Sequence, residues 1–93
     1  MNLIPETAGR RILELAWNPD TGTFTEVEAP VLAWELAPDP RPVHLLGELR
    51  GAWAILEPYT GQAYIPCEAV FSSRAECVRE LRHQARLLAG ADL

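Results

Sequence analysis

The sequence contains no lysine. All eight of its basic residues are arginines, and thirteen acidic residues outnumber them. The formal net charge is therefore −5 at pH 7. A surface with this balance repels nucleic acid and anionic membranes and attracts basic partners. We therefore expect no direct binding of nucleic acid or of a membrane.

Cysteines and long apolar runs are also scarce. The two cysteines, Cys67 and Cys77, lack the CxxC spacing of common metal sites. No run approaches the ~18 apolar residues of a membrane-spanning helix, and residues 1–5 are too short for a secretory signal. We expect a cytoplasmic protein whose reduced thiols behave as small buried hydrophobic groups, with a disulfide between them as the alternative.

Familiar catalytic motifs are missing. The sequence holds no GxSxG, no HExxH and no glycine-rich phosphate loop. Helix capping explains Ser73, a solvent-facing helix explains His83, and chance proximity explains any pairing of Cys67 with His44. We therefore expect a protein that is not an enzyme and that needs neither metal nor cofactor.

The 93 residues suit one domain spanning residues 1–93. A chain of this size buries somewhat over ~60% of its unfolded surface, which is enough for one core. A binding surface is therefore favoured over a deep catalytic cleft.

The first half of the chain predicts strands. Residues 11–17 and 23–29 alternate apolar and polar positions and flank a strong turn at 18–22 that contains Asn, Pro and Gly. Residues 31–37 predict a third strand. The proline-rich stretch 38–42 predicts a stiff connection that crosses an edge of the sheet.

The most continuously apolar stretch lies in the middle of the chain. Residues 43–49 and 52–56 flank Arg50 and Gly51 and predict a β-hairpin at the centre of the sheet. A turn at 57–61 and a further strand at 62–65 follow. Residues 1–9 predict an N-terminal arm that is ordered at Leu3 and Ile4.

The C-terminal segment changes to helical periodicity. Ser73 and Glu76 match a capping box, and Gly90 suits the position after a helix, so we predict a helix over residues 73–89. Its apolar stripe comprises Val78, Leu81, Ala85 and Leu88. The predicted fold is α+β: an antiparallel sheet of five to six strands within residues 10–66, with this helix packed on one face and the other face partly wet.

The opposite face of that helix is basic. This face is explained either by contact with nucleic acid or by simple solvation with pairs such as Glu76–Arg79, and the net charge favours the second explanation. The residues are Arg79, Arg82, His83 and Arg86.

The acidic residues concentrate in the N-terminal half. Between Ile12 and Pro40 there is no basic residue, and the six acids there are Glu14, Asp20, Glu26, Glu28, Glu35 and Asp39. Glu26 and Glu28 share one strand face about 6.5–7 Å apart, and we expect Glu14 on the same side. A row of carboxylates resembles a row of phosphates to a basic protein groove. Simple solubility is the alternative explanation.

Aromatic residues supply a second kind of contact. Each of the three tryptophans lies in a predicted strand, where core packing is the default. Trp17, beside the first turn, and Tyr59, at the tip of the second, are the two that we expect to be accessible to a partner.

In length, acidity, α+β plan and the acidic stretch 12–40, the chain resembles the small single-domain anti-CRISPR proteins of phages and mobile elements. The resemblance implies a stoichiometric inhibitor, in the cytoplasm of a bacterial host, whose six acids cover a basic nucleic-acid-binding surface of a CRISPR effector. The alternative is an accessory or structural protein-interaction module of a phage or bacterial assembly. The sequence leaves open the partner and the choice between monomer and weak dimer.

Overall fold

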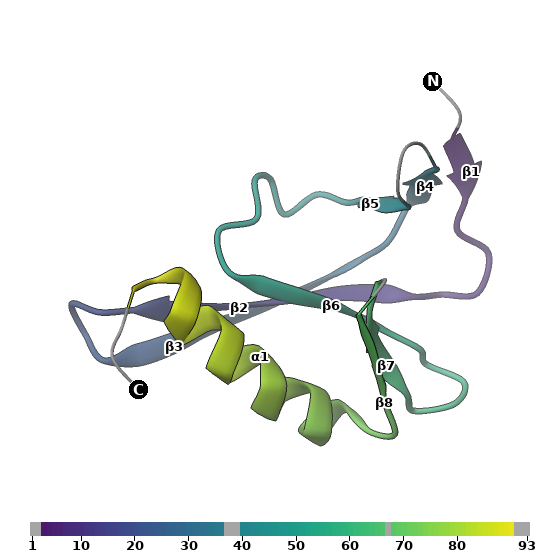
Figure 1. Cartoon of the computed structure of the whole chain (residues 1–93). Coiled ribbons are helices and arrows are strands. Elements are labelled where there is room, and N and C mark those ends of the chain that lie inside the picture. The colour runs from purple at the N-terminus through teal and green to yellow at the C-terminus, as the bar shows by residue number, and fades with distance from the viewer. Residues whose placement is uncertain (1–2, 37–39, 67, 91–93) are drawn as a thin grey trace.

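The computed structural model describes residues 3–36, 40–66 and 68–90, in which eight strands form two sheets and one helix follows them (Figure 1). The elements are β1 (Leu3–Pro5), β2 (Arg11–Asn18), β3 (Thr23–Pro30), β4 (Ala33–Glu35), β5 (Arg41–Val43), β6 (Ala52–Leu56), β7 (Ala63–Ile65), β8 (Ala69–Phe71) and α1 (Arg74–Leu88). Both sheets are antiparallel, with orders β3-β2-β6-β7-β8 and β1-β4-β5. The predicted α+β class, with a five-stranded sheet and a C-terminal helix on one face, is confirmed.

Strand β2 is an interior strand of the large sheet, between β3 and β6. Its alternating apolar residues point to both faces, and Ile12, Leu13 and Leu15 are almost fully buried. The turn to β3 forms as predicted: the Asn18 side chain accepts from the backbone of Asp20, and Gly22 takes a φ of 66°. The β2–β3 hairpin therefore follows from local sequence.

One face of the large sheet packs against α1. Leu13, Leu15, Ala54 and Ile65 meet the buried helix stripe, which consists of Cys77, Leu81 and Ala85. Leu88 was predicted in that stripe and is instead 65% exposed. The prediction was wrong because the i, i+4 series through Cys77 faces the sheet, and it ends at Ala85.

The helix start follows the capping prediction in part. The Ser73 hydroxyl accepts from the backbone N–H of Glu76 at 3.3 Å. The Glu76 carboxylate binds the backbone N–H and hydroxyl of Ser72, rather than reaching back to Ser73. At the other end, Gly90 takes a φ of 72° after the Ala89 cap.

The other face of the large sheet carries a second apolar cluster. Ile12, Val31 and Ile55 are buried there, and Leu46 and Leu49 pack over them. The predicted hairpin of residues 43–49 with 52–56 is wrong: residues 44–51 form no strand, and β6 pairs with β2 and β7. The apolar run covers this sheet face instead of pairing, so the face is only partly wet.

The small sheet lies on the side of the large sheet that faces away from α1 (Figure 1). It was not predicted as a separate sheet. Of the described residues in the predicted strand 31–37, Ala33–Glu35 form a strand, β4. The end of the proline-rich stretch contributes to β5, an edge strand, where Pro42 needs no hydrogen-bonding partner strand on its outer side. Strand β8 was also not predicted. Among the described residues, α1 is neither long nor apolar enough to cross a membrane.

Candidate functional site

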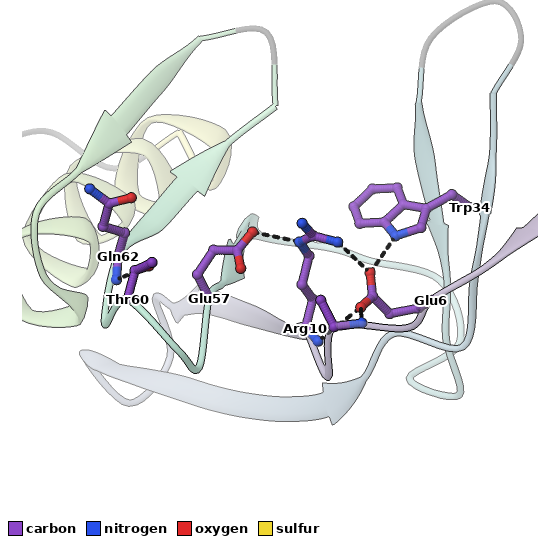
Figure 2. A network of polar contacts seen from close by, with 7 residues as sticks. Glu6, Arg10, Trp34, Glu57, Thr60 and Gln62 are labelled. Atoms are coloured by element: carbon purple, nitrogen blue, oxygen red, sulfur yellow. Dashed lines mark hydrogen bonds and ion pairs between the residues drawn. The ribbon is translucent and has the colours of Figure 1, made fainter.

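A charged network joins the start of the chain to both sheets. Glu6 follows β1, and its side chain is only 2% exposed. Its carboxylate accepts hydrogen bonds from the Trp34 indole and the Arg10 Nη1, each at 2.9 Å, and from the backbone N–H groups of Ala8 and Arg10 (Figure 2). Residues 3–9, the described part of the arm expected at residues 1–9, are therefore held within the fold.

Arg10 carries the network across to the large sheet. Its Nε donates to Glu57 at 2.5 Å, while its Nη1 binds Glu6 (Figure 2). Glu57 opens the turn 57–61, which is closed by a bond from the Gly61 N–H to the Glu57 carbonyl. The Arg10 guanidinium thus ties the N-terminal segment to this turn, and Glu6 ties the same segment to β4 through Trp34.

The network holds fixed charges. Burial works against ionisation of Glu6, but the hydrogen bonds from Trp34, Arg10 and Ala8 outweigh it and lower the Glu6 pKa to about 2. The bonds to Glu57 and Glu6 raise the pKa of Arg10 above its already high ordinary value. Neither group exchanges a proton near neutral pH, so the network suits positioning and electrostatics rather than acid–base catalysis.

An open, largely apolar groove of about 570 Å³ lies between the small sheet and the β7–β8 end of the large sheet; we name it the interface groove. Its lining residues are Arg10, Trp34, Pro40, Tyr64, Ile65, Pro66, Glu68, Ala69 and Val70. Two aromatic rings and several aliphatic groups with few charges are the usual lining of a binding groove.

The edge strand β8 forms one side of the interface groove. Tyr64 on β7 and Val70 on β8 are cross-strand partners, and both line the groove. Val70 is 72% exposed although it is β-branched and apolar. Burial raises the pKa of Tyr64, so its hydroxyl stays protonated at neutral pH. An exposed apolar side chain on an unpaired strand edge is a feature of sites that bind another chain.

The predicted acidic row is neutralised where it forms. Glu26 and Glu28 do share a face of β3, but Arg74 pairs with both of them and Arg11 pairs with Glu28. Glu14 was expected beside them, and that prediction is wrong. Glu14 stands opposite Val27 in the register, so it points to the other face, where it accepts from the backbone N–H groups of Arg50 and Gly51.

The remaining predicted acids lie apart from one another. Asp20 is exposed in the β2–β3 turn, and Glu35 is in the small sheet, opposite Arg41. Asp39 lies outside the described residues, as does Cys67. The structure therefore does not gather the described acids of this set into one surface.

The predicted aromatic contacts are accessible to different degrees. Tyr59, on the turn 57–61, is 85% exposed. Trp17 is half-buried: its ring lies 4.9 Å from that of Phe24, and the Arg86 guanidinium stacks over it at 5.1 Å. Neither residue lines the interface groove.

The arginine face of α1 packs partly on these rings. Arg82 and Arg86 lie over Phe24 at 5.4 and 5.2 Å. The expected pair of Glu76 with Arg79 does not form within the described part of the chain.

No group of three or more His, Cys, Asp or Glu side chains in residues 3–36, 40–66 and 68–90 is placed to hold a metal ion. The residues that line the interface groove were not singled out from the sequence. The sequence held a signal for one pair in the network. Glu6 and Arg10 have opposite charges and are four residues apart, and Gly9 between them can take the positive φ that brings them together. The partnership with Trp34 and Glu57 is long-range and has no local signature.

Comparison with known proteins gives no relative: no family model, curated protein or solved structure matches this chain.

Proposed function

We propose that this protein is a non-enzymatic protein-interaction module that binds an extended apolar segment of another protein in the interface groove. The observation that carries the proposal is the groove itself, with Trp34 and Tyr64 in its lining and exposed Val70 at its edge. The ion pairs of Arg10 hold two of its sides in place before any partner arrives, which reduces the ordering cost of binding.

The position of β8 favours an extended segment. The groove runs beside β8, which is the last strand in the sheet order and, among the described strands, pairs with β7 alone. A strand edge offers backbone N–H and C=O groups to an incoming strand, and pockets beside it accept alternate side chains.

Inhibition through nucleic-acid mimicry is the competing proposal, and the same geometry supports it less. It requires several carboxylates facing one partner, whereas Glu26 and Glu28 are paired with arginines and Glu14 faces the other way. A stoichiometric inhibitor that acts through the interface groove stays compatible with our proposal, since inhibition describes the effect of binding and not the surface used.

Affinity capture from a bacterial lysate tests the proposal with three baits: the wild type, Val70→Arg and Leu45→Arg. Leu45 is 82% exposed and lies outside the interface groove. Leu45→Arg is therefore the control: like Val70→Arg, it replaces an exposed apolar side chain with arginine, but it leaves the groove unchanged. We expect a protein retained through a high-salt wash by the wild type and Leu45→Arg and lost with Val70→Arg. Retention by all three baits contradicts groove binding. Release by salt and by competing DNA contradicts groove binding and supports mimicry.

A further inference from the structure

We infer that the segment bound in the interface groove carries an arginine or lysine beside its apolar contact residue, and that Glu68 pairs with that basic side chain. The inference rests on the proposed function and adds the chemistry of the partner. Its basis is the charge balance of the groove.

The fixed charges around the groove are mostly negative. Arg10 is its basic lining residue, and two carboxylates, those of Glu6 and Glu57, already pair with it. Glu68 also lines the groove, is exposed, and forms no ion pair with any described residue. These four groups together carry two negative charges in excess.

This excess selects against an acidic segment. Among the described lining residues, Arg10 alone carries a cation that would attract a carboxylate, and its Nε and Nη1 donors are already engaged at 2.5 and 2.9 Å. An acidic side chain would meet Glu68 without a compensating cation, and like charges brought together oppose binding.

The aromatic lining fits a basic side chain as well. The Trp34 indole N–H is used by Glu6, so what the ring offers a ligand is its π surface. Arginine and lysine lay their aliphatic stems along apolar surface and place their cationic heads over aromatic faces or beside carboxylates. Trp34, Tyr64 and Glu68 in one groove supply all three contacts.

Selection from a random peptide library displayed on phage tests the inference, with the whole protein as the target and with Val70→Arg as the counter-target. The strongest selected peptide is then synthesised together with a version whose basic residue is replaced by glutamine. Binding of both peptides is measured against the wild type, Glu68→Gln and Glu48→Gln. Glu48 is exposed and outside the groove, so its substitution makes the same change in net charge.

We expect the selected peptides to be enriched in arginine or lysine. Glu68→Gln should weaken the parent peptide about two- to fivefold, as is typical of an exposed ion pair, and Glu48→Gln should leave it unchanged. The loss should disappear for the glutamine peptide, because the pair is already broken. The Trp34 indole N–H signal in NMR spectra should shift with the parent peptide.

Two other results have distinct meanings. Peptides that lose binding with Val70→Arg but lack a basic residue, or that ignore Glu68→Gln, overturn the inference and leave the proposed function in place. A selection that yields no peptide sensitive to Val70→Arg, or a protein that self-associates through this groove in sedimentation experiments, overturns both.

Discussion

The Trp34 indole donates a hydrogen bond to the Glu6 carboxylate across 2.9 Å, and it thereby joins the segment after β1 to β4. This bond and the pair with Arg10 explain how a carboxylate that is 2% exposed stays charged. Buried carboxylates of this kind make folding stability depend on pH.

The Glu6→Gln variant should lose stability near neutral pH and much less in acid. The folded pKa of Glu6, about 2, lies below its ordinary 4.5, so the charged form stabilises the fold above pH 4.5 and that contribution fades as the pH falls toward 2. At pH 7 the loss should be roughly 3 kcal/mol as an upper value. Urea unfolding of both proteins at several pH values measures it. A wild-type-to-variant difference that stays constant from pH 7 to pH 2.5 would contradict the assignment.

Gly51 should tolerate no side chain. A Cβ there would lie 2.2 Å from the Leu15 carbonyl oxygen and 2.8 Å from the Ala16 Cα, both backbone atoms of β2. Gly51→Ala must push β6 away from β2 and weaken the Glu14 bonds to this turn, which should cost about 1–3 kcal/mol or more. Thermal unfolding measures the loss.

Gly22→Ala is the matched control for Gly51→Ala. Gly22 has nothing within 4 Å of the position of an added Cβ, and its φ of 66° is the sole obstacle. Left-handed backbone costs an alanine about 1–2 kcal/mol. If Gly51→Ala proved no more destabilising than this control, the close approach to β2 would not limit the site.

The elements that sequence patterns predicted well are those specified by neighbouring residues. The β2–β3 hairpin follows from alternation around one Asn–Pro–Asp–Thr–Gly turn, and α1 follows from its cap at Ser73 and its period. Both depend on contacts within about twenty residues, so their signals are complete in the local sequence.

The features that the sequence did not predict depend on contacts between residues that are far apart in the chain. The apolar run at 43–49 has the composition of a strand, yet Leu46 and Leu49 cover a sheet face, and nothing local distinguishes the two uses. The neutralisation of Glu26 and Glu28 depends on Arg74, which is 46 or more residues away in sequence. The interface groove arises where two sheets meet, so its residues share no motif.

The thiol of Cys77 should be unreactive in the folded protein. It is fully buried against the sheet, and burial raises its pKa to about 11, so very little thiolate exists at pH 8. In a Cys67→Ser background, labelling by a thiol reagent should be far slower in the native protein than in denaturant. Equal labelling rates in the two states would contradict the packed position of Cys77.

Arg74 and Arg79 offer a matched test of whether the acidic residues bind a partner. Each Arg→Ala change removes one positive charge, but only Arg74→Ala releases Glu26 from its ion pair and removes one of the two ion pairs of Glu28. Exposed pairs contribute about 0–1 kcal/mol, and a cation in the first helical turn opposes the helix dipole, so the stability loss should be well below 1 kcal/mol. The two variants should differ more in binding than in stability. If carboxylate mimicry operates, Arg74→Ala should bind an oligoarginine peptide more tightly than Arg79→Ala does at low salt, since Glu26 becomes available and Glu28 is left with Arg11 as its partner. Equal binding by the two variants would show that these glutamates do not serve as a binding surface, and the interface groove would then be the stronger proposal.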